Sequence, residues 1–293
     1  MAAGSFGALV SLAAWAPVHA GERCVEDDTG QEVCLEAPAQ RIVALSPGAT
    51  ELLFAAGAGD HVVAAVSHAD YPEEAADLPR VGSYDRLDME SILAHEPDLV
   101  IGWTSGNSSS QLERIESLGV PLYRSDPRHL EEIATSLERL GALASSEEVA
   151  EAEAARFRDA VAELEAEYAG RDPVRVFYQI WPDPVMTIND EQIISESIRI
   201  CGGENVFGDL GSLTPRLDTE SVLEADPEAI VAGGMGEADD AWLDEWRRYD
   251  VLEATAKDNL FFVQPSTIQR PTPRILEGTR ALCDKLEQAR RNR

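Results

Sequence analysis

The sequence predicts an α/β protein of two lobes, each with a central, mostly parallel sheet flanked by helices, joined by one long α-helix. Residues 90–102 recur as residues 220–232, and most differences between the two copies are conservative. Each copy runs from a short helical stretch through an acidic-Pro pair into an apolar run typical of a buried strand. A long helical pattern lies between the copies. Two similar lobes explain this repeat, and the alternative is a chance recurrence of ordinary helix-to-strand punctuation.

The first twenty residues predict an export signal. They carry no charge, contain an apolar core, and end in a small-residue pattern that favours cleavage after Ala20. A membrane anchor is the competing interpretation, but the apolar stretch is short and interrupted by Gly and Pro. No lipidation pattern precedes Cys24. We therefore expect a soluble periplasmic protein whose residues 1–20 are removed.

Four cysteines in an exported chain predict two disulfides, because the periplasm is oxidising. Cys24 and Cys34 flank a turn-forming stretch, so a leading hairpin would bring their sulfurs together. The remaining pair is Cys201 and Cys283, which would fasten the last helix to the body of the second lobe. Metal binding is the alternative, but no Cys-x-x-Cys or Cys/His spacing supports a metal site.

The N-terminal lobe is expected to span residues 21–144, including the leading hairpin. Buried strands are predicted at 41–45, 62–66, 99–102 and 121–123, with helical stretches between them at about 87–95 and 108–118. The first of these strands breaks at Ser46-Pro-Gly and continues as a helix from Thr50. Strands that alternate with helices indicate a parallel sheet covered by helices on its faces.

The linker and the C-terminal lobe follow at residues 145–170 and 171–293. The linker is rich in Ala and Glu, has apolar residues at helical spacing, and begins with a serine suited to cap a helix. A rigid helix of this length would hold the lobes apart at nearly fixed geometry. A strand at 174–180 then starts the second lobe.

Composition and motifs restrict the function. The formal net charge is −30, with 54 acidic and 24 basic residues, so nucleic acid and anionic membranes would be repelled. An enzyme of hydrolase type is the alternative from a different class, because Ser46 and Ser105 lie near strand ends. Neither serine stands in Gly-x-Ser-x-Gly, and Walker, Gly-x-Gly-x-x-Gly and His-Glu-x-x-His motifs are missing from the sequence. We therefore expect a binding protein.

Four segments carry a family resemblance. Residues 41–57, 70–72, 96–103 and 201–207 resemble, in the same order and spacing, the helical-backbone substrate-binding proteins of bacterial ABC importers. The resemblance covers roughly residues 40–288 and is greatest to the cobalamin-binding members. It implies a corrinoid carried as transported ligand, with no cofactor. Relatives of this architecture also carry haem or ferric siderophores, which stay open as alternatives, and a histidine or Tyr84 could be an axial haem ligand.

The resemblance also implies where the ligand lies. In the cobalamin-binding members aromatic side chains enclose it between the lobes, and broad apolar ring faces suit such walls. Two matches depart from the family pattern, because His68 stands where tyrosine is usual and Thr214 where tryptophan is usual. The cleft loop 266–274 contributes Arg270, whereas Arg274 is expected to cap the next helix or pair with an acid. The ligand-binding residues expected in this chain are His68, Tyr84, Trp103, Ile180, Trp181, Thr214 and Arg270.

Glu90 and Glu220 occupy the same place in the two copies of the repeat. In the family, one surface glutamate on each lobe meets arginines on the importer's membrane subunits, and these two residues match those positions. Equivalent glutamates on similar lobes would address a two-fold symmetric permease dimer. We expect the chain to act as a monomer in this role.

Overall fold

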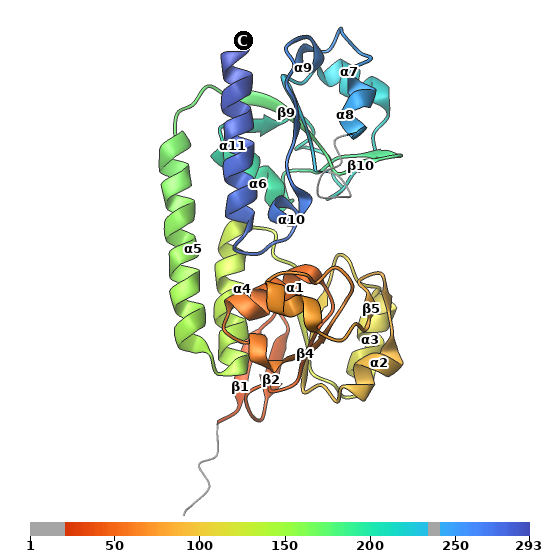
Figure 1. Cartoon of the computed structure of the whole chain (residues 1–293), viewed down its shortest axis with the longest axis vertical. Helices are drawn as coiled ribbons and strands as arrows, with labels where there is room; N and C mark the ends of the chain where they lie inside the picture. The colour runs from red at the N-terminus through yellow and green to blue at the C-terminus, as the bar shows by residue number, and fades with distance from the viewer. Residues whose placement is uncertain (1–20, 234–240) are drawn as a thin grey trace, which may run out of the picture.

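The computed structural model describes residues 21–233 and 241–293, and it has two α/β lobes stacked along its long axis (Figure 1). Helix α5 (Glu147–Tyr168) runs along one side of both lobes, packed on α4 (Leu130–Ala144) of the first lobe and α11 (Ile275–Arg291) of the second. The predicted fold class is confirmed. The expected export signal, residues 1–20, lies outside the described residues.

Each lobe has a four-stranded sheet whose strands are all parallel. In the first lobe the order is β4 (Val62–Ala65), β3 (Ile42–Ala44), β7 (Leu99–Trp103) and β8 (Leu122–Ser125). In the second lobe it is β12 (Gly203–Asn205), β9 (Val174–Gln179), β13 (Ala229–Ala232) and β14 (Leu260–Phe262). Parallel strands need crossover connections, which the intervening helices supply.

The sequence repeat corresponds to one structural unit in each lobe. Helix α2 (Met89–Ala94) leads into β7, and α7 (Thr219–Ala225) leads into β13. Both strands occupy the third place in their sheets. Both helices are preceded by an aspartate at the N-cap, Asp88 or Asp218. Its side chain accepts a hydrogen bond from the backbone N–H three residues later, at Ser91 or Ser221. The two copies therefore fold alike because the same capping residues and the same apolar run occur in each.

Alternating strand residues build a core on both faces of each sheet. In β7, Leu99 and Ile101 pack on the side of α4 and α1 (Pro47–Ala55), whereas Val100 packs with Ile92 and Ile115 on the other side. The side chains of β9, β7 and β13 are almost all buried, as expected for strands covered on both faces. Burial of this kind fixes the strand ends, which carry the functional side chains.

Shorter elements complete the lobes. In the first they are η1 (Gly59–His61), η2 (Glu73–Asp77), β5 (Gly82–Ser83), β6 (Arg86–Leu87) and α3 (Ser109–Ser117). In the second they are β10 (Trp181–Pro182), β11 (Val185–Met186), α6 (Ile193–Ile200), α8 (Ala241–Trp246), α9 (Glu253–Ala256) and α10 (Pro265–Ile268).

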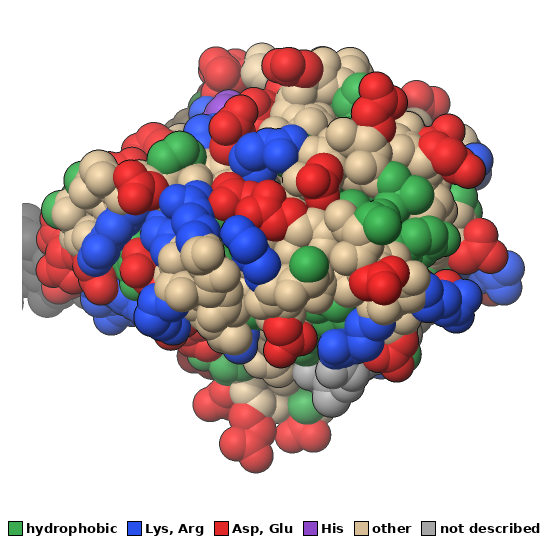
Figure 2. Space-filling view, turned by 90° about the horizontal axis from the view of Figure 1, so that it is seen from above, with side chains coloured by type: hydrophobic (Ala, Val, Ile, Leu, Met, Phe, Trp, Pro, Cys, Tyr) green, Lys and Arg blue, Asp and Glu red, His purple; other side chains and the backbone are tan. Residues whose placement is uncertain are grey.

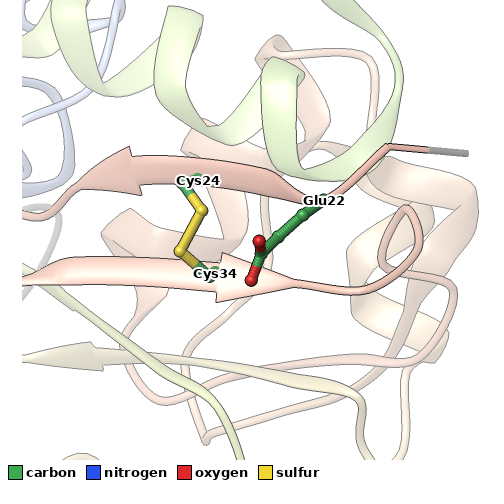
Figure 3. Close-up of side chains that lie close together, drawn as sticks. All are labelled: Glu22, Cys24 and Cys34. Carbon is green, nitrogen blue, oxygen red and sulfur yellow. A yellow bond between two sulfur atoms is a disulfide. The ribbon is translucent and has the colours of Figure 1, made fainter.

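Both expected disulfides are formed. Cys24 in β1 (Arg23–Glu26) is bonded to Cys34 in β2 (Glu32–Leu35), directly across the hairpin, with Glu22 beside them (Figure 3). Glu22 and these two sulfurs lie close enough together to hold a metal ion. The sulfurs are bonded to each other, however, and offer no thiolate. The second disulfide joins Cys201, at the end of α6, to Cys283 in α11.

Two expected helix starts differ from the structure. Helix α1 (Pro47–Ala55) begins before Thr50, because the Ser46 side chain accepts a hydrogen bond from the Ala49 N–H and proline is favourable at the first helical position. Ser145 ends α4 in the left-handed conformation (φ 63°), so α5 begins at Glu147. Ser146 is at the cap position, without a capping hydrogen bond from its side chain.

The surface is dominated by acidic side chains. Figure 2 shows one end of the molecule, where acidic groups are spread over the face with basic groups among them. Acidic and basic side chains form ion pairs at several places in the structure, such as Arg293 with Glu228 at 2.9 Å. Within residues 21–233 and 241–293, every helix is too short or too polar to cross a bilayer.

Candidate functional site

A cavity of about 470 Å³ lies between the two lobes. It opens at the carboxyl ends of the first-lobe strands, because Ser46 follows β3, Trp103 ends β7 and Ser125 ends β8. This edge of a parallel sheet is where α/β proteins usually bind ligands. The other lining residues are Pro47, Gly48, Ala49, Leu52, His68, Asp70, Tyr84 and Pro127 of the first lobe and Pro265, Ser266, Gln269, Arg270 and Pro271 of the second.

Two aromatic rings form one wall of the cavity. The rings of Tyr84 and Trp103 are tilted by 55°, with centroids 5.5 Å apart, and Tyr84 is 41% exposed. The Trp103 ring lies over the backbone of Gly106, where a Cβ atom would come within 2.0 Å of it. Glycine at 106 therefore makes room for the ring. The exposed aromatic surface is suited to the face of a large apolar ring system.

Asn107 joins the segments that carry both rings. Its Nδ2 donates to the carbonyls of Leu45 (3.0 Å) and Tyr84 (2.7 Å), and its Oδ1 accepts from the Trp103 N–H at 2.7 Å. Asn107 is buried and does not line the cavity. Since buried polar groups are costly when unpaired, this amide specifies where the Tyr84 and Trp103 segments lie.

Arg270 forms the polar side of the cavity, where the lobes touch. Its Nη1 lies 2.6 Å from Glu51 Oε1 and 3.1 Å from Asp70 Oδ1, and its Nη2 donates to the His68 carbonyl at 3.2 Å. All three partners belong to the first lobe. The sequence predicts lobes that the linker helix holds apart. In the structure they are in contact here, because Arg270 of the second lobe binds these groups of the first.

Glu51 is the most buried member of this contact, with a side chain that is only 2% exposed. Burial raises the pKa of its carboxyl above the ordinary value, whereas the hydrogen bond and charge of Arg270 act in the opposite direction. Arg274 lies 3.4 Å from Glu51 and its guanidinium sits 3.9 Å from the centre of the Tyr71 ring. Arg274 thus pairs with an acidic neighbour, one of the two roles expected for it.

The cavity collects four of the seven expected ligand-binding residues: His68, Tyr84, Trp103 and Arg270. The other three lie outside its lining. Ile180 packs against the hydrophobic core, and Thr214 is exposed in the loop before α7. Trp181 is half-buried, and its Nε1 donates to the Asp183 carbonyl. It belongs to β10, which Figure 1 shows on the side of the second lobe that faces the first.

Glu90 and Glu220 are exposed, each in the first turn of its helix. Figure 1 shows α2 and α7 on the side of the molecule away from α5, one on each lobe. The two glutamates therefore occupy equivalent positions on the two lobes.

The serines considered for catalysis have structural partners. Ser46 caps α1, and the Ser105 hydroxyl donates to Asp126 at 2.5 Å. In a serine triad a histidine accepts the hydroxyl proton, and neither of these contacts is with a histidine.

Two lobes joined by a long helix, with an aromatic and polar cavity between them, define a substrate-binding protein of the helical-backbone class. Residues 42–267 match the family described as periplasmic binding protein. The chain belongs to this family. It is 36% identical over 256 residues to the vitamin B12-binding protein of Vibrio campbellii, covering 87% of this chain and 92% of that one.

Solved structures are similar as well. The periplasmic vitamin B12 binding protein BtuF of Vibrio cholerae superposes with a TM-score of 0.80 at 34% identity, covering 86% of this chain and 98% of that one. The periplasmic heme-binding protein RhuT from Roseiflexus sp. RS-1 superposes with a TM-score of 0.76 at 25% identity, covering 86% and 99%.

Three residues important to the site were not singled out from the sequence. Glu51 stands within a resemblance segment but reads as an ordinary helix residue, and Gln269 stands within the flagged cleft loop. Asn107 follows Ser-Gly and has the pattern of a plain turn. Only the fold shows that these side chains lie beneath or along the cavity.

Proposed function

We propose that the protein captures a corrinoid, cobalamin, between its lobes and delivers it to an ABC importer of the bacterial inner membrane. The observation that carries this proposal is the inter-lobe cavity with the Tyr84–Trp103 wall on one side and Arg270 on the other. A corrin has broad apolar faces and a rim of polar amides, so an aromatic wall beside polar groups matches it. Support also comes from relatives named vitamin B12-binding protein.

His68, Tyr84, Trp103 and Arg270 are the first contacts we assign to the ligand. Ile180, Trp181 and Thr214 would approach it from the second lobe. The cavity volume of about 470 Å³ lies within the range of roughly 300–1,000 Å³ that is typical of sites for drug-sized ligands. A corrinoid is larger than such ligands, so part of it would extend toward the β10 edge of the cleft.

Haem is the second candidate ligand. The heme-binding relative shares the fold at 25% identity, and His68 lines the cavity, where an imidazole could bind the iron axially. A ferric siderophore is less favoured, because the aromatic wall suits a flat ring better than a hydroxamate or catecholate shell.

Delivery would use Glu90 and Glu220. Both are exposed and equivalent on the two lobes, as contacts to a two-fold symmetric permease dimer should be. Charge-assisted pairing with arginine would weaken as salt rises. The double variant Glu90→Ala with Glu220→Ala should lower stimulation of the importer in proteoliposomes and leave ligand affinity unchanged. A loss of affinity would argue against docking.

We place the mature chain in the periplasm as a monomer that binds without turnover. The family, the predicted export signal and the two disulfides support that location.

Isothermal titration of the mature protein with cyanocobalamin tests the ligand, with haemin as a parallel titrant. One-to-one corrinoid binding supports the proposal. Binding of haemin alone would transfer the assignment to the second candidate, and binding of neither would refute both.

A further inference from the structure

A cluster of charged and polar groups beside the cavity joins the two lobes. Glu51 in α1 receives Arg270 at 2.6 Å, Arg274 at 3.4 Å and the Thr272 hydroxyl at 3.0 Å. The acceptor is from the first lobe and all three donors come from one short segment of the second. Each carboxylate oxygen therefore has a partner from across the lobe boundary.

This cluster forms a partition. Arg270 lines the inter-lobe cavity, whereas Glu51 and Arg274 line a separate hollow of about 620 Å³ behind it, between α1 and α5. Glu51 does not line the inter-lobe cavity. It therefore acts on a ligand there indirectly, through Arg270 and through the segment 270–274 that it binds.

The same segment lies against the start of α1. A Cβ atom added at Gly48, in the first turn of α1, would be in ordinary van der Waals contact with Pro271 at 3.6 Å and Thr272 at 3.8 Å. Thr272 itself is completely buried. The segment is therefore anchored at Thr272, and the carboxylates of Glu51 and Asp70 orient the Arg270 side chain.

We propose that Glu51 is a positioning residue for the ligand site: it holds the Arg270 guanidinium at the cavity wall and fixes the spacing of the lobes behind the ligand. This inference rests on the proposed function. An arginine free to rotate would lose side-chain entropy on binding, and a lobe boundary free to open would add to that cost. The contact with Glu51 meets both costs before the ligand arrives. Asp70 alone would hold Arg270 less firmly, since its side chain is 64% exposed to water.

The test compares three single variants by titration with cyanocobalamin, at a temperature where each is folded by circular dichroism. Glu51→Gln keeps the side-chain shape and removes the charge, and should weaken binding about tenfold or more, since hydrogen bonds to charged groups are strong. Thr272→Val removes only the hydrogen bond to the second oxygen and should weaken binding roughly threefold. Glu228→Gln is the matched control, because Glu228 pairs with Arg293 and the Arg175 N–H within the second lobe. It should change affinity less than about twofold.

A double-mutant cycle separates positioning from general stability. If Glu51 acts through Arg270, Arg270→Gln should cost much less affinity in the Glu51→Gln background than in the wild type. If the losses of affinity in the two single variants add up in the double variant, or if Glu51→Gln binds like the wild type, the inference is overturned. The proposed function would not be affected by either result. If Glu51→Gln does not fold, unchanged affinity in Thr272→Val overturns it. A wild type that binds neither cyanocobalamin nor haemin refutes the proposed function, and the inference with it.

Discussion

Asn107→Leu replaces the amide beneath the aromatic wall by an apolar side chain of similar size. It removes two hydrogen bonds that Asn107 donates, to Leu45 and Tyr84, and one that it accepts from Trp103. Leu45 is fully buried, so its carbonyl has no access to water in place of the amide. Tyr84 is 41% exposed, so water can replace the amide at its carbonyl more easily. We expect the variant to lose about 2–4 kcal/mol of stability, the cost of one or two unpaired buried groups.

The ligand site should suffer as well. With the Trp103 and Tyr84 segments no longer joined, their rings lose the fixed 5.5 Å arrangement that a flat ligand would meet. Aromatic contacts contribute about 0.5–1.5 kcal/mol each beyond area burial, so affinity for cyanocobalamin should fall about three- to tenfold. Thermal unfolding measures the first effect, with a melting temperature lower by roughly 5–10 °C. Titration below that temperature measures the second.

Asn205→Leu is the matched control. Asn205 is also buried and also makes three hydrogen bonds, to the Ile188 carbonyl, the Ser195 hydroxyl and the Phe207 N–H. It belongs to the second lobe, however, and its hydrogen bonds hold neither ring of the aromatic wall. It should lose similar stability and keep wild-type affinity. If both variants lose affinity equally, or if Asn107→Leu keeps it, the reasoning is refuted.

Three further outcomes follow from the same structure. Trp103→Ala and Trp181→Ala should each weaken cyanocobalamin binding, Trp103→Ala more strongly because it lines the cavity, and unchanged affinity in both would assign the rings to packing alone. Replacing Cys201 and Cys283 by alanine should lower stability by about 4 kcal/mol, because their bond closes a long loop, and a melting temperature equal to that of the wild type would contradict this. Ligand should change the radius of gyration in small-angle scattering very little, because α5 and the inter-lobe ion pairs fix the lobes; a large contraction would show a hinge.

The fold was predictable because its signals are local. The helix-to-strand change at each acidic-Pro pair lies within a few residues, and it located both β7 and β13. The linker helix was likewise visible from its spacing of apolar residues. Its start was not, because only the backbone reveals that Ser145 adopts a left-handed conformation and ends the preceding helix.

The site was only partly predictable because it depends on contacts between distant segments. Glu51 and Arg270 are 219 residues apart, and no periodicity links them. Trp103 was expected because it stands in segment 96–103, one of the segments that carry the family resemblance. Asn107 was missed because its role depends on three backbone groups that only the folded loop brings to its side chain.

The central claim is that a corrinoid lies between the lobes against Tyr84 and Trp103. A crystal structure of the complex with cyanocobalamin, with anomalous data collected at the cobalt edge, tests it most directly. The account predicts one cobalt peak in the inter-lobe cavity, with the corrin face against those two rings and Arg270 at its rim. A peak elsewhere on the molecule, or an empty cavity in crystals grown with excess ligand, would contradict it.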